Sequence, residues 1–67
     1  MTVKIIIDKA DAQGCMRTEC RVLYAENGAA IERRIESILS NLKADGYKEV
    51  ILRDCFNLEY PDIFQHP

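Results

Sequence analysis

The sequence predicts a small α+β domain in which two strands, a helix and a third strand follow one another (β-β-α-β). Three observations support this order: a β-branched apolar run near the start, an alternating stretch after it, and an amphipathic segment before a second apolar run. A chain of 67 residues makes one domain, with a thin margin of buried surface. We expect a mainly antiparallel three-stranded sheet packed on one helix.

The first strand is expected at residues 2–8, where TVKIIID is rich in β-branched side chains. Val3, Ile5 and Ile7 share one face, and Ile6 lies on the other. Apolar side chains on both faces indicate a central strand. The small and polar residues 9–14, KADAQG, predict a turn before the second strand.

The second strand is expected at residues 15–25, where apolar and polar side chains alternate. The charged side chains of Arg17, Glu19 and Arg21 share one face, which we expect to be in contact with water. The opposite face is expected to belong to the core, and it carries Met16, Thr18, Cys20, Val22 and Tyr24. The first two strands should form an antiparallel hairpin.

A helix is predicted over residues 28–45, preceded by Asn27 as the N-cap and ended by Gly46. Its apolar side chains recur at helical spacing and form one stripe directed at the core, made of Ile31, Ile35, Ile38, Leu39 and Leu42.

The third strand is expected at residues 48–54, and we expect the spatial order 2-1-3 with the first strand in the middle. The charged face of the second strand suits an edge, and this order makes both neighbouring pairs antiparallel. The alternative pairs strands two and three directly through a right-handed crossover. In either arrangement one helix covers one face, and we expect the other face to retain Ile6, Leu23, and Ile51 or its neighbours.

The C-terminal segment, residues 55–67, is unusually apolar for a chain end. It could extend the third strand or form a short fourth strand, and we expect it to pack back on the open sheet face or on a second subunit. The alternative is a free docking peptide that folds on a partner. The residues predicted to bind a partner are Phe56, Leu58, Tyr60, Ile63 and Phe64 of this segment, together with Arg17 and Arg21.

The charge and hydropathy of the chain argue against several classes of function. Nine basic and eleven acidic residues give a net charge of −2, whereas nucleic-acid-binding domains usually carry a basic excess. No apolar run approaches the roughly 18 residues of a membrane span, and the first residues lack a signal-peptide pattern. We therefore expect a cytosolic protein whose three cysteines are free thiols.

Residues suited to catalysis or metal binding are few. Cys15, Cys20, Cys55 and His66 are the only soft metal ligands, and their spacing does not match the close pairs of structural zinc sites. No histidine lies near a cysteine in sequence, and no glycine-rich phosphate loop is present. We expect no catalytic residues, no metal and no cofactor.

The sequence thus favours a small cytosolic binding protein: an adaptor, an inhibitor or a regulatory subunit that acts through protein–protein contacts. Compact inhibitors made by phages and plasmids are of this size. We expect a homodimer, because a three-stranded sheet leaves two edges and one face to be covered. The alternative is a nucleic-acid-associated regulator, and a metal- or thiol-dependent activity comes third.

Overall fold

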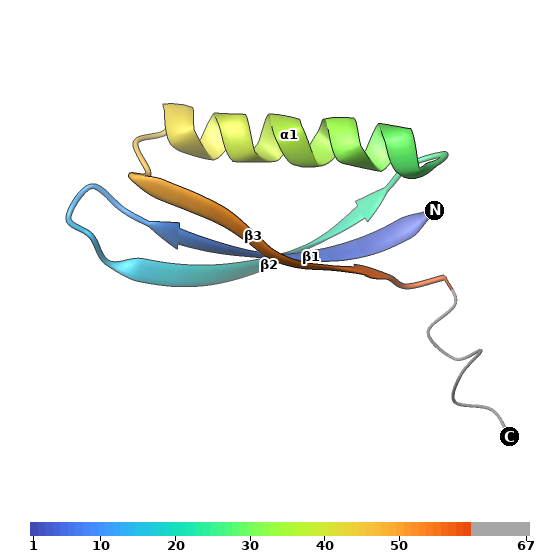
Figure 1. Ribbon diagram of the computed structural model, residues 1–67, viewed down its shortest axis with the longest axis horizontal. Coiled ribbons are helices and arrows are strands. Elements are labelled where there is room, and N and C mark those ends of the chain that lie inside the picture. The colour runs from blue at the N-terminus through green and yellow to red at the C-terminus, as the bar shows by residue number, and fades with distance from the viewer. Residues whose placement is uncertain (60–67) are drawn as a thin grey trace, which may run out of the picture.

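The computed structural model describes residues 1–59, so the predictions made for Tyr60, Ile63 and Phe64 lie outside it. The strands are β1 (Thr2–Ala10), β2 (Met16–Tyr24) and β3 (Glu49–Asn57), and the helix α1 spans Gly28–Ala44. Both strand pairs are antiparallel, and the sheet has the order β2-β1-β3. The helix lies across one face of the sheet (Figure 1). This confirms the predicted α+β fold and its 2-1-3 order.

β1 is the central strand, and its odd-numbered apolar side chains form the middle of the core. Ile5 and Ile7 are completely buried and Val3 is 3% exposed. β1 continues past Asp8, where it was expected to end, to Ala10, because its last residues also pair with both neighbouring strands. The predicted central position of this strand is therefore confirmed.

The turn between β1 and β2 holds the two strands in a fixed register. The side-chain carboxylate of Asp11 accepts hydrogen bonds from the backbone N–H groups of Gln13 and Cys15, both at 2.9 Å. Gly14 has a φ of 87°, a conformation that glycine adopts without strain. Beyond this turn, residues from Ala10↔Met16 to Thr2↔Tyr24 pair without a shift.

The helix α1 begins after Asn27, whose side-chain oxygen accepts a hydrogen bond from the Ala30 N–H at 2.9 Å. This is the predicted N-cap, which satisfies one of the free amides of the first turn. Asp45 caps the other end, and Gly46 follows with a φ of 102°, as a helix-ending glycine does. The predicted apolar stripe packs on the sheet: Ile31, Ile35 and Leu42 are buried, and Ile38 and Leu39 are partly buried.

β3 is longer than expected and reaches Asn57, so the start of the C-terminal segment pairs with β1 as a continuation of this strand. The pairing shifts between Ile6 and Ile7 of β1, which oppose Asp54 and Leu52. Arg53 is therefore an extra residue, a β-bulge that bends the strand and increases its twist.

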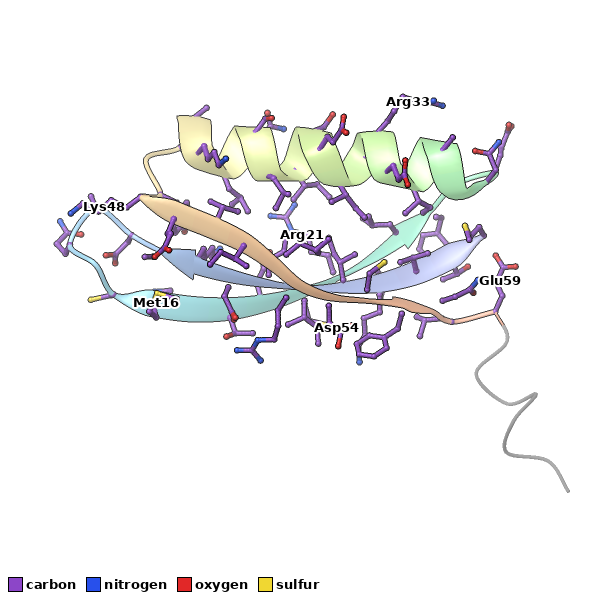
Figure 2. The ribbon with its side chains drawn as sticks, in the orientation of Figure 1. Met16, Arg21, Arg33, Lys48, Asp54 and Glu59 are labelled. Atoms are coloured by element: carbon purple, nitrogen blue, oxygen red, sulfur yellow. The ribbon has the colours of Figure 1, made fainter. Side chains whose placement is uncertain are left out.

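The faces of β2 are the reverse of the prediction. Leu23 is buried at 4% exposure, whereas Val22 and Tyr24 are 45% and 66% exposed. The reason is the hairpin register, which places Leu23 opposite the buried Val3. Figure 2 shows Arg21 between the sheet and α1, and Asp54 on the other side of the sheet. The side chains expected in the core, including Cys20, instead lie on the face that the helix leaves open.

The core is a single cluster between α1 and one face of the sheet. Within residues 1–59 it contains no buried polar or charged residue. The same part of the chain has no helix with the length and apolar character needed to cross a membrane.

Candidate functional site

The face of the sheet opposite α1, here called the open face, carries a group of exposed apolar side chains. The even-numbered residues of β1 point to this face. The exposed apolar side chains belong to the residues of β2 and β3 that lie opposite them. Ile6 contributes from the centre as expected and is half-buried by its neighbours. Groups of exposed apolar side chains on a small protein mark interaction sites. The large ones are Met16, Val22, Tyr24, Ile51 and Phe56, which are 42–66% exposed.

Phe56 anchors one end of the open face. The Lys4 ammonium lies 5.7 Å from the centroid of its ring, a distance at which a cation is attracted to an aromatic face. The backbone N–H of Leu58 donates to the Thr2 carbonyl at 2.8 Å, which holds the end of this segment against β1. Lys4, Phe56 and Leu58 help to line a shallow open depression of about 490 Å³.

Charged groups on the open face are balanced. The Arg53 Nε donates to the Asp8 Oδ2 at 2.7 Å, and the Thr18 hydroxyl donates to the Asp8 Oδ1 at 2.8 Å. These two hydrogen bonds, that of Arg53 first, hold the pKa of Asp8 below its ordinary value. The bulge at Arg53 turns its side chain to the same face as Asp54, which opposes Ile6. The open face therefore carries the basic side chains of Lys4 and Arg53 and the acidic ones of Asp8 and Asp54, so it has no basic excess.

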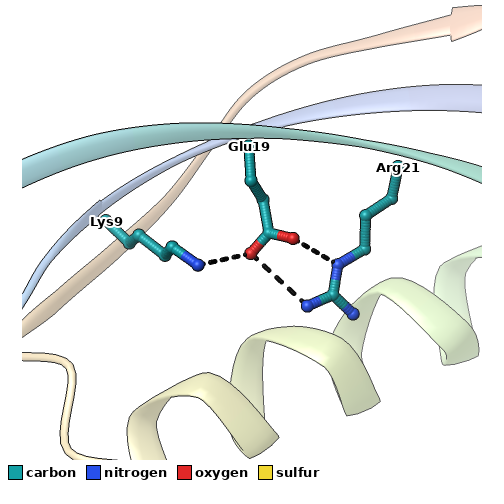
Figure 3. A network of polar contacts seen from close by, with 3 residues as sticks. All are labelled: Lys9, Glu19 and Arg21. Carbon is teal, nitrogen blue, oxygen red and sulfur yellow. Dashed lines mark hydrogen bonds and ion pairs between the residues drawn. The ribbon is translucent and has the colours of Figure 1, made fainter.

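A second polar group lies on the helix side of the sheet, at the edge formed by β2. Glu19 accepts hydrogen bonds from Arg21 Nε at 2.6 Å and from Lys9 Nζ at 2.7 Å (Figure 3). The hydrogen bond from Arg21, followed by that from Lys9, lowers the pKa of Glu19 to about 2. The Lys9 ammonium also lies 4.6 Å from the centroid of the Tyr47 ring. The charged side chains of β2 are thus arranged beside the helix rather than on an open wet face.

The structure separates the predicted partner-binding residues. Phe56 is exposed on the open face, and Leu58 is half-buried next to it. Arg21 belongs to the ion-pair network beside the helix, and Arg17 is an exposed residue of the same strand face. The sequence interpretation missed the exposed apolar residues of β2 as site residues, because their regular alternation is also the pattern of a core-facing strand.

The three cysteines do not converge. Cys15 lies in the turn before β2, and Cys20 and Cys55 lie on opposite faces of the sheet, because they oppose Ile6 and Ile5 of β1. Among residues 1–59, no three side chains suited to metal binding come together. His66 lies outside the described residues.

Comparison with known protein families, with curated proteins and with solved structures finds no match to this chain. Its function is therefore inferred from the chemistry of the surface described above.

Proposed function

We propose that this protein is a small binding protein, an adaptor, inhibitor or regulatory subunit, and that it binds a protein partner through the open face of its sheet. The observation that supports this function is the group of exposed apolar side chains on the open face, which come from β2 and β3 on either side of the half-buried Ile6 of β1. Burying apolar surface is the main favourable contribution to protein association. Aromatic and methionine side chains such as Tyr24, Phe56 and Met16 are also enriched in protein interfaces.

The charges of the open face favour a protein over a nucleic acid. A surface that binds single strands combines aromatic side chains with a positively charged groove. Tyr24 and Phe56 would supply the aromatic groups. Arg53, however, is paired with Asp8, and Asp54 adds a second acidic side chain to the same face as Lys4. A nucleic-acid-associated regulator is accordingly the second candidate.

The third candidate, a metal- or thiol-dependent activity, has less support. Cys20 and Cys55 lie on opposite faces of a continuous sheet, so their sulfur atoms are unsuited to binding one ion together. The absence of enzymatic activity stays a prediction.

The test compares two variants of the tagged protein in affinity capture from the cells that make it, with and without nuclease. Ile51→Thr/Phe56→Thr makes the open face polar while keeping residue types that suit a strand. Cys55→Thr is the matched control, because Cys55 is an exposed residue of the same strand on the other face. We expect the captured protein to survive nuclease, to be lost with the double variant and to be retained by the control.

Two results would contradict this function. Loss of every captured molecule after nuclease treatment would favour the nucleic-acid-associated regulator. Capture that is equal for the double variant and the control, both shown to be folded by circular dichroism, would mean that the open face is not the binding surface.

A further inference from the structure

We propose that two copies of this chain pair through the outer edge of β2, antiparallel, about a two-fold axis at Cys20. This pairing goes beyond the function proposed above and uses different atoms, namely backbone groups at an edge of the sheet rather than side chains on its open face. It would join the two sheets into one continuous sheet of twice the width.

The backbone of β2 presents a regular row of hydrogen-bonding groups to this edge. The Ala25 N–H donates to the Met1 carbonyl and the Asp11 N–H to the Cys15 carbonyl, each at 3.0 Å. The odd-numbered residues Cys15 and Ala25, one before and one after β2, thus form backbone hydrogen bonds with Asp11 and Met1, the residues that flank β1. Along a strand of an antiparallel pair, the backbone groups of every second residue point away from the partner strand. The N–H and C=O groups of Thr18, Cys20 and Val22 therefore point outward, where the sheet has no further strand among the described residues.

The other edge of the sheet is less suited to pairing. β3 carries the bulge at Arg53, which interrupts the row of backbone groups and twists the strand. Such bulges are one way in which proteins protect an edge. β2 has no bulge or proline, and it pairs with β1 over its whole length without a shift.

Arg34 limits the pairing at one end. Its Nη1 reaches from α1 and donates to the Tyr24 carbonyl at 2.7 Å, so that outward-pointing acceptor already has a partner. We therefore assign the paired segment to Thr18–Val22, where the three outward-pointing residues have no such contact. In this register Thr18 lies opposite Val22 of the second copy, and Cys20 lies opposite Cys20. The two residues of each such pair would form two backbone hydrogen bonds with each other.

Charges on the helix side select the register. With the axis at Cys20, Glu19 of each copy lies opposite Arg21 of the other. Moving the axis to Glu19 places Glu19 opposite Glu19, and moving it to Arg21 places Arg21 opposite Arg21. Like charges directly opposite one another destabilise a strand pair, and opposite charges stabilise it. Moving the axis to Thr18 also matches charges, but it sets Val22 against Gly14, beyond the end of the strand.

This register places both helices on one side of the joined sheet and both open faces on the other. In an antiparallel pair, side chains directly opposite one another point to the same side. Val22 and Tyr24 of one copy would then continue the apolar surface of the other. The pairing would thus enlarge the apolar surface of the open face without covering it.

The three natural cysteines provide the test. Opposite residues in a hydrogen-bonded antiparallel pair have Cα atoms about 5.5 Å apart, within the range of roughly 4.4–6.8 Å that a disulfide spans. A variant that keeps only Cys20 is compared with variants that keep only Cys15 or only Cys55, all three cysteines being exposed. Each is treated with diamide, which takes up two electrons and two protons as two thiols form one disulfide.

We expect the Cys20-only variant to form a covalent dimer at least about tenfold faster than the other two, and to lose this advantage in urea. In light scattering, the unmodified chain should have about twice the 7.7 kDa mass of one copy at micromolar concentrations. Val22→Pro removes an outward N–H that β1 does not use, and should give a folded monomer, whereas Val22→Ala should stay dimeric.

Equal rates of cross-linking for the three single-cysteine variants would overturn the register. A mass of one copy at every concentration, for a protein shown to be folded, would overturn the pairing itself. Ile51→Thr/Phe56→Thr changes the open face and leaves this edge intact, so it should keep the dimer. Failure of the open-face function and failure of the edge pairing are thus distinguishable.

Discussion

Truncating Leu23 and its neighbour Val22 tests which face of β2 the helix covers. Leu23 is 4% exposed, and replacing a buried leucine with alanine costs about 2–5 kcal/mol. Val22 is 45% exposed, so nearly half of its surface is in contact with water in the folded protein. Since fully burying a valine is worth about 1.5–3 kcal/mol and Val22→Ala removes only part of the side chain, we expect a loss below about 1 kcal/mol.

The size of the chain makes this difference easy to measure. At roughly 0.05–0.15 kcal/mol per residue, 67 residues give a free energy of unfolding of about 3–10 kcal/mol. Leu23→Ala should therefore remove at least about a fifth of the stability, and Val22→Ala a smaller part. The assay is urea denaturation followed by circular dichroism, with the free energy of unfolding taken by linear extrapolation.

The reverse order, with Val22→Ala as costly as Leu23→Ala or more so, would refute the face assignment. It would mean that the core lies on the side of β2 that carries Met16, Cys20 and Tyr24, as the alternation alone predicts. If Leu23→Ala does not fold at all while Val22→Ala folds with most of its stability, that difference itself supports the face assignment.

Three further predictions concern other parts of the chain. The pKa of Glu19 is lowered to about 2, so its ion pair should stabilise the fold above about pH 5 and lose this effect as pH falls toward 2. Its size, reduced by partial exposure, is about 1–2 kcal/mol, and Glu19→Gln should flatten this part of the pH profile. Gly46→Ala should cost about 1 kcal/mol in thermal unfolding, and Gly28→Ala less, because of these two glycines Gly46 alone has a positive φ. Deleting residues 61–67 should lower the midpoint of urea unfolding or the dimer mass, and unchanged values would instead favour a docking peptide.

The parts of the fold that could be predicted are those with several independent signals. For α1, the apolar stripe, the N-cap Asn27 and the positive-φ Gly46 all indicate the same limits. For β1, apolar residues on both faces indicate the centre of the sheet, and the order 2-1-3 follows from this together with the charges of β2. Agreement between local signals is what makes such predictions reliable.

The alternation of β2 predicts the wrong face, because the more apolar face of a strand is not always the one that the helix covers. That choice depends on the register of the hairpin, and a shift of one residue reverses it. Here the register depends on how Asp11 and Gly14 close the turn, at atomic detail that residue types do not specify. The bulge at Arg53 was likewise not predicted, since no glycine or proline marks it.

The orientation of β2 also explains why the open face is apolar. An edge strand that turned its apolar face to the helix would have placed Arg17, Glu19 and Arg21 in water and left a polar open face. β2 instead directs Leu23 into the core and keeps Glu19 in an ion pair beside the helix, where Lys9 and Arg21 neutralise it. An exposed apolar face next to an edge without a bulge or proline is a risk of non-specific association unless something specific covers it. The two surfaces left open in residues 1–59, the apolar face and the edge of β2, are therefore the observations on which the proposed binding function rests.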